Sequence, residues 1–194
     1  MKVAITEVFC EIITGLAVFC VAIPLFDWVS LVSFAEFTSA TKSHWNAPTL
    51  TAACAALYLV GLLFDAVGLM ADGLLEKAFG VDPPDATQRA AFWNHVSSHV
   101  LEYRNETWAY YFCYRNLLVL TAPAAVTWAG ALFSHGQRVA AAVAIVLAAA
   151  AGVAFWASAK TLLGLYYEIT KAITHPPVSN DRTRTLGGAS AAAG

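Results

Sequence analysis

The sequence predicts an all-α integral membrane protein with four transmembrane helices. Of its 194 residues, 59% are hydrophobic and 12% are charged, whereas a soluble domain has roughly 45–50% apolar and 25% charged residues. The mean hydropathy is +0.61. A helix that crosses the hydrocarbon core of a bilayer needs about 20 apolar residues, and the chain has four runs of about this length or longer. They lie near residues 8–26, 49–76, 108–133 and 139–170.

These four runs also set the domain organisation. They leave little material for a second folded unit, so we expect residues 1–175 to form a single four-helix transmembrane domain. The residues after Pro177 are polar at first and then rich in Gly and Ala, a composition that cannot bury a core. Residues 176–194 are therefore predicted to be a disordered cytoplasmic tail.

The segment between the first two runs is semi-polar. It carries Trp28, Phe34, Phe37 and Trp45 among polar residues, and tryptophan is typical of membrane interfaces. We expect an amphipathic segment that lies at the outer interface and does not cross the membrane.

An extended cytoplasmic helix is predicted at about residues 86–104, between the second and third runs. Pro83 and Pro84 end the preceding helix, and Asp85 with Gln88 three residues later forms the pattern of a capping box. No Gly or Pro separates this helix from the span at 108–133. The span itself contains Pro123, and a short turn leads from it to the Ala-rich fourth run.

The distribution of basic residues predicts the orientation, because Lys and Arg in short loops favour the cytoplasmic side. Two of them, Lys42 and Arg138, flank the spans on one side. Seven flank them on the other: Lys2, Lys77, Arg89, Arg104, Lys171, Arg182 and Arg184. Both termini are therefore expected to be cytoplasmic, in the plasma (inner) membrane of a bacterium.

Composition and motifs exclude several classes of function. A net charge of −2 gives no basic field for nucleic acid. The four cysteines include no C-x-x-C pair, which argues against disulfide exchange. The sequence also lacks a phosphate-binding glycine loop and a serine-nucleophile elbow.

Acidic residues in the second run form the first candidate site. Asp65 and Asp72 lie seven residues apart, and Glu76 follows four residues later, so all three project from one face of a helix. A charge within hydrocarbon costs on the order of 2.5–3.5 kcal/mol. We therefore expect these carboxylates to face protein or water.

Arg115 and Lys160 lie within the third and fourth runs, at depths similar to that of Asp65 when about 1.5 Å is counted per residue. Together with Asp72 they are predicted to form a neutral cluster between three helices. The cluster has two interpretations that the sequence leaves open. It is either an ion-pair staple that fixes the register of the bundle, or the lining of an ion path, proton path or ligand pocket.

Two further groups of residues are candidates. His95, His99 and Glu102 fall at spacings of four and three on the predicted cytoplasmic helix, so they form a possible edge for a divalent metal or simply a solvated polar face. Aromatic residues crowd the inner end of the third run and suggest either an interfacial belt or a headgroup or ligand contact. The residues singled out for that contact are Trp108, Tyr111, Tyr114 and Arg104.

Three classes of function remain. The first is a homo-oligomeric pore or membrane effector whose charged cluster lines or gates an ion path. The second is a non-catalytic scaffold or assembly factor that binds a soluble cytoplasmic partner through the face from Phe92 to Tyr103. The third is an enzyme acting on a lipid or quinone with His95, His99 and Glu102. Membrane lipids are partners in every case, and no cofactor beyond the possible divalent metal is expected.

Overall fold

The computed structural model describes residues 2–29 and 47–172, and these residues form five helices. They are α1 (Lys2–Trp28), α3 (Ala47–Phe79), α4 (Ala86–His95), α5 (Ser98–Ser134) and α6 (Arg138–Ala172). No strand occurs within the described ranges, and α1, α3, α5 and α6 are each long and apolar enough to cross a membrane. The all-α class with four candidate spans is confirmed at this level. Most of the predicted segment at 27–48 and the whole predicted tail at 176–194 lie outside the described residues.

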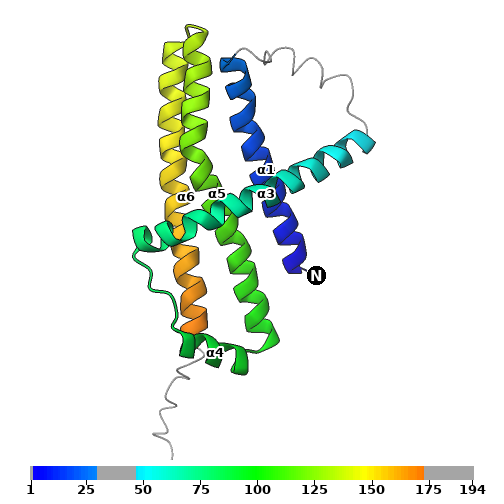
Figure 1. Cartoon of the computed structure of the whole chain (residues 1–194), viewed down its shortest axis with the longest axis vertical. Coiled ribbons are helices and arrows are strands. Elements are labelled where there is room, and N and C mark those ends of the chain that lie inside the picture. Colours follow the sequence, from blue (N-terminus) through cyan, green and yellow to red (C-terminus); the bar gives the residue numbers. More distant parts are fainter. Residues whose placement is uncertain (1, 30–46, 173–194) are drawn as a thin grey trace, which may run out of the picture.

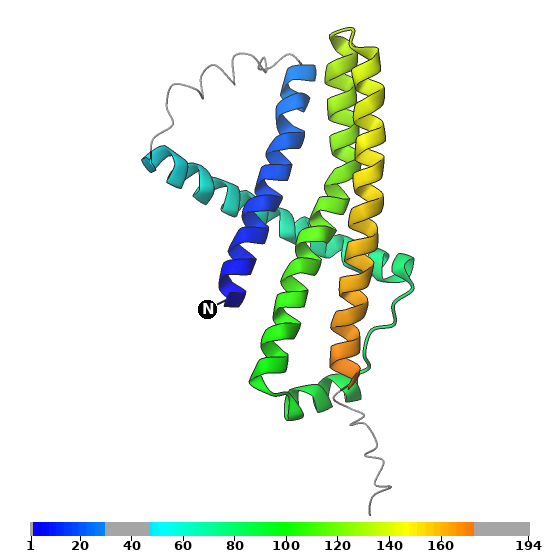
Figure 2. The same ribbon diagram turned by 180° about the vertical axis from the view of Figure 1, so that it is seen from behind.

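Three of the long helices lie side by side, and the fourth crosses them. α5 is packed between α1 and α6, with the three axes close to parallel. α3 lies crosswise over α1 and α5 (Figures 1 and 2). As a result, any row of side chains on the inner face of α3 meets the other helices one after another.

Two glycines allow the close approach of α1 and α3. A Cβ added to Gly15 would lie 2.0 Å from the carbonyl oxygen of Leu57, and one added to Gly61 would lie 2.1 Å from the carbonyl oxygen of Glu11. Real Cβ atoms do not approach oxygen this closely, so any larger residue would push the two backbones apart. The small residues therefore fix the place where α3 crosses α1.

The prediction of one cytoplasmic helix at 86–104 is wrong in the extent of that helix. α4 ends at His95, Val96 is extended, and Ser97 caps α5 by accepting a hydrogen bond from the backbone N–H of Val100 at 3.4 Å. A serine cap satisfies a backbone donor at a helix start, so the chain begins a new helix without Gly or Pro. From Ser98 onward α5 continues without a break to Ser134, through the region predicted as a separate span at 108–133.

The predicted capping box is confirmed. The backbone N–H of Gln88 donates to Asp85 Oδ1 at 2.7 Å, and the backbone N–H of Asp85 donates to Gln88 Oε1 at 3.0 Å. At the far end of the bundle, Gly136 turns the chain from α5 to α6 with a φ of 76°. Pro123 lies inside α5 and does not end it, as neighbouring helices allow in membrane bundles.

Candidate functional site

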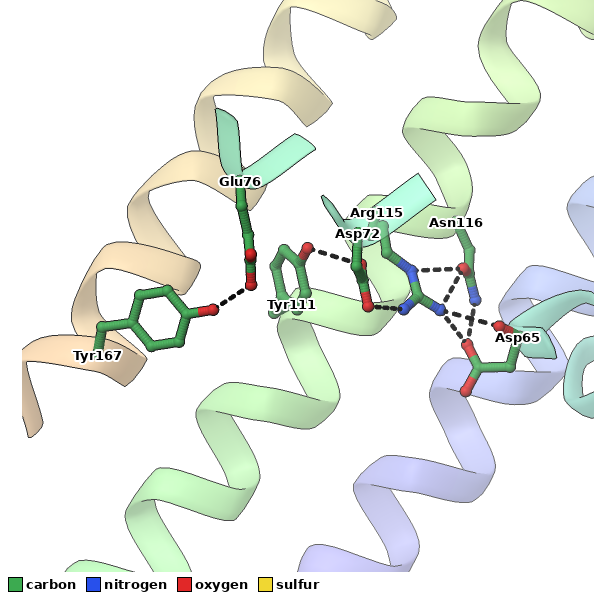
Figure 3. Close-up of polar contacts among 7 residues, drawn as sticks. All are labelled: Asp65, Asp72, Glu76, Tyr111, Arg115, Asn116 and Tyr167. Atoms are coloured by element: carbon green, nitrogen blue, oxygen red, sulfur yellow. Dashed lines mark hydrogen bonds and ion pairs between the residues drawn. The ribbon is translucent and has the colours of Figure 1, made fainter. Parts of the chain in front are cut away.

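Arg115 on α5 is the centre of a polar network inside the bundle. Its side chain has no exposed surface, and it forms ion pairs with Asp65 at 2.7 Å and with Asp72 at 3.0 Å, both on α3. Nε and Nη2 also donate to Asn116 Oδ1, at 3.1 and 2.9 Å. The predicted meeting of Asp65, Asp72 and Arg115 is thus present, and Figure 3 shows that the guanidinium is held on both sides.

Gly68 makes room for this guanidinium. It lies on α3 between the two aspartates, one turn from each, and is buried. A Cβ at this position would lie 2.4 Å from Asn116 Oδ1 and 2.5 Å from Arg115 Nη2. Gly68 is not among the predicted site residues, although a glycine midway between two acids seven residues apart is a signal that can be read from the sequence.

The network continues along α3 towards α6. The hydroxyl of Tyr111 donates to Asp72 Oδ1 at 2.9 Å, and the hydroxyl of Tyr167 on α6 donates to Glu76. Figure 3 shows the carboxylates of α3 meeting partners from α5 and then α6 in turn. Because α3 lies crosswise, the network runs across the bundle and not along the axes of α5 and α6.

Lys160 is not part of the network. It is exposed on α6, whereas its neighbour Ala159 and the residue one turn on, Leu163, have no exposed surface. Successive residues of a helix are rotated by about 100°, so the buried position of Ala159 turns Lys160 away from Arg115. Counting residues along the helix correctly placed Arg115 at the level of Asp65. The count was not enough for Lys160, because it does not give the direction in which a side chain points.

Acidic groups outnumber basic groups around Arg115. Asp65 and Asp72 share the one guanidinium, and Glu76 is bound by a tyrosine hydroxyl and not by a cation. Glu11 of α1 packs against Gly61, one turn from Asp65. The neutral cluster predicted from two bases and two acids is therefore replaced by a cluster with a single base.

Arg104 and the aromatic residues form a second buried set at the end of the bundle near α4. Arg104 Nε donates to Thr170 Oγ1 at 3.1 Å, Nη2 donates to the hydroxyl of Tyr166, and the guanidinium lies 4.7 Å from the centre of the Phe92 ring. Arg104 is 8% exposed. It ties α5 to α4 and α6 through cation–π contacts and hydrogen bonds.

The aromatic residues predicted as a headgroup or ligand contact are used mainly inside the protein. Tyr111 is 1% exposed, Trp108 stacks on Tyr166 with ring centres 4.3 Å apart, and Tyr114 packs 6.2 Å from Phe155. Burial of Tyr111 removes it from any surface contact with lipid.

The candidate metal ligands are not brought together on one helix. His95 is the last residue of α4, whereas His99 and Glu102 lie on α5 beyond the break at Ser97, and all three are exposed. The predicted helical spacing therefore still relates His99 to Glu102 but does not relate His95 to His99. In the part of the chain that the structure describes, no three His, Cys, Asp or Glu side chains are placed to hold a metal ion.

The face proposed for a soluble partner is also partly used within the chain. Phe92 is 1% exposed and packs against Arg104, while Trp93 beside it is 58% exposed and Tyr103 is 50% exposed. Only the outer part of the Phe92-to-Tyr103 face is therefore accessible.

The fold and the site together define a helical bundle with the composition of a multi-pass membrane protein and a polar network centred on Arg115 between its helices. Comparison of the chain with protein-family models, with curated proteins and with solved structures found no match.

Proposed function

We propose that the protein is a multi-pass membrane protein that assembles into homo-oligomers and whose buried acidic network lines or gates an ion path. The observation that supports this is the excess of carboxylates around Arg115, on helices apolar enough to cross a membrane. Ionisable groups at such positions are costly and are typical of ion and proton pathways.

The crosswise course of α3 is the reason for proposing an assembly. The network follows α3 and so occupies one level of the bundle, which means that a single chain supplies one layer of polar groups and no continuous path along α5 and α6. Large apolar side chains are exposed on α3 and α6, among them Leu63 at 73%, Met70 at 83% and Val146 at 66%. These surfaces suit contact with lipid or with further copies of the chain.

Ion flux into liposomes tests this proposal. Asp72→Asn keeps the size of the side chain and removes its charge, so we expect loss of most of the flux seen with the wild type. Glu168→Gln is the matched control, since Glu168 is exposed on α6 and outside the network. Equal flux in the wild type and Asp72→Asn would contradict the proposal.

A membrane scaffold or assembly factor is the second candidate. The geometry of Arg115 supports it, because Nε, Nη1 and Nη2 all have partners within the chain, as expected for a staple that fixes helix register. This candidate predicts a stable partner on gentle extraction and no ion flux. Substitution of Trp93 by Ala, at the accessible part of the Phe92-to-Tyr103 face, should then release the partner.

The orientation is part of the proposal. α4 and the last turn of α6 lie at one end of the bundle, α1 begins towards that same end, and the α5–α6 turn lies at the other (Figures 1 and 2). The excess of Lys and Arg in the sequence favours the first end as the cytoplasmic one. A reporter that is active only outside the cytoplasm should therefore be active when inserted at Gly136 and inactive when fused to the C-terminus.

A further inference from the structure

A small cavity between α1 and α5 lies beside the Arg115 network. Its volume is about 20 Å³, and a cavity needs a volume of roughly 10–15 Å³ to hold one water molecule. It is lined by Glu7, Cys10, Glu11, Thr14, Ala109, Phe112, Cys113 and Asn116. The cavity therefore has room for one water molecule or a small ion, next to several polar side chains.

Two polar atoms at this cavity have no hydrogen-bond partner. They are Glu11 Oε2 and Thr14 Oγ1. Thr14 is 1% exposed, and buried hydroxyl groups in proteins are almost always hydrogen-bonded. Glu11 and Thr14 both line the cavity, so a ligand bound there is a candidate partner for both orphaned atoms.

Glu11 forms no ion pair within the described residues. Arg115 already pairs with Asp65 and Asp72, and Asn116 Nδ2 donates to Asp65 Oδ1 at 2.7 Å (Figure 3). The other titratable groups that face Glu11 are Glu7 and Cys10 on α1, Asp65 on α3 and Cys113 on α5. Of these groups, Glu7 and Asp65 are carboxyl groups, and a negative charge on either disfavours a negative charge on Glu11.

We propose that Glu11 and Thr14 form a proton-binding site, in which Glu11 carries the proton and one water molecule bridges its carboxyl group to the hydroxyl of Thr14. The proton removes the charge of a half-buried carboxylate that has no ion pair, and the water provides partners for both orphaned atoms. Arg115 sets the arrangement indirectly, because its ion pairs with Asp65 and Asp72 occupy its guanidinium and leave no ion pair for Glu11. The site does not require the chain to conduct ions, so its test is separate from the flux experiment.

Labelling with dicyclohexylcarbodiimide tests the proposal on the wild-type chain in liposomes. This lipid-soluble reagent reacts with protonated carboxyl groups, and peptide mapping by mass spectrometry identifies the labelled residue. We expect most of the label on Glu11 and little on Asp65 or Asp72. Label on the aspartates with none on Glu11 would overturn the proposal, and this measurement needs no variant that has to fold.

Salt dependence distinguishes a proton from a metal cation. Labelling of Glu11 should be equally fast in sodium chloride and in choline chloride at the same ionic strength. Protection by sodium alone would mean that a sodium ion occupies the cavity, and it would overturn the assignment of a proton.

Infrared spectroscopy tests the water bridge. The carbonyl stretch of a protonated carboxyl group should be lost in Glu11→Gln and retained in the control Glu168→Gln, since Glu168 is exposed on α6 and lies outside the cavity. In Thr14→Val, which keeps the side-chain shape but removes the hydroxyl group, the band should shift to higher frequency because its hydrogen bond is weakened. An unshifted band in Thr14→Val would overturn the bridging role of Thr14.

Discussion

The guanidinium of Arg115 has no contact with solvent, so the stability of its charge depends entirely on protein groups. Asp65 and Asp72 supply the opposite charge. Asn116 accepts hydrogen bonds from the guanidinium, and Gly68 leaves the space that the guanidinium occupies. Removing one partner of a buried ion pair leaves the other charge unpaired. The consequences should therefore be much larger for Arg115 than for a surface arginine.

Arg115→Leu is expected to lower the free energy of unfolding by about 3–5 kcal/mol, because two carboxylates are left without a cation. Arg89→Leu is the matched control, since Arg89 is exposed on α4 and its loss should change the free energy of unfolding by no more than about 0.5 kcal/mol. Chemical unfolding in mild detergent measures both values.

The triple variant Arg115→Leu, Asp65→Asn, Asp72→Asn extends this prediction. It removes all three charges together, so it should recover part of the stability lost in Arg115→Leu. If the triple variant is no more stable than Arg115→Leu, the loss in the single variant comes from packing and not from unpaired charge.

At the scale of elements, the crossing of α1 and α3 depends on backbone contact. Gly15→Ala or Gly61→Ala places a methyl group about 2 Å from a carbonyl oxygen of the facing helix, and overpacking of this kind costs about 1–3 kcal/mol. Gly73→Ala is the control, because a Cβ there meets nothing within 4 Å. It should be neutral or stabilise the helix by about 0.5–1 kcal/mol, and thermal unfolding of the three variants compares them directly.

Arg104 joins three elements, α4, α5 and α6, through Phe92, Tyr166 and Thr170. Arg104→Gln removes the charge that faces these rings, and hydrogen bonds to charged groups contribute about 1.5–3 kcal/mol. We expect faster hydrogen exchange in α4 and in the last turns of α6, with little change in α1. Uniform change over all helices, or none in α4, would show that Arg104 does not hold these elements together.

The sequence was sufficient for the helices and for part of the site, and the failures have physical causes. Hydropathy measures how long an apolar segment is, so it predicted the spans; it carries no information on their mutual angle, so the crosswise α3 was not predicted. Counting residues gives the depth of a side chain along its helix, and this was enough to predict that Asp65 and Arg115 meet. It does not give the rotation of the side chain about the helix axis, so it did not predict that Lys160 points outward. The break at Ser97 contains no Gly or Pro, and for this reason the helix at 86–104 was predicted as continuous.

Glu11 and Thr14 were missed for a related reason. A single acid near the start of an apolar run indicates little by itself, and only the packing of α1 against α5 shows that its oxygen has no partner. The residues that line the cavity lie on α1 and α5, which are far apart in the sequence.

At the scale of the whole molecule, the exposed apolar faces of α3 and α6 lead to a prediction about assembly. In mild detergent the wild type should run as a defined oligomer, and Asp65→Asn, which weakens the hold of α5 on α3, should loosen it. Light scattering with correction for bound detergent gives the protein mass. A monomer in both cases would contradict the assembly and favour the internal staple.

The inclination of α3 also links the protein to the thickness of its bilayer. With 33 residues α3 is about 50 Å long, whereas the hydrocarbon core is about 30 Å thick, so a thin bilayer suits an oblique helix. Longer acyl chains favour a more upright α3, and a rotation of that kind would draw Asp65 and Asp72 away from Arg115. We therefore expect the thermal stability of the protein to fall as the acyl chains of the host lipid lengthen, which makes the buried ion pairs a sensor of lipid length.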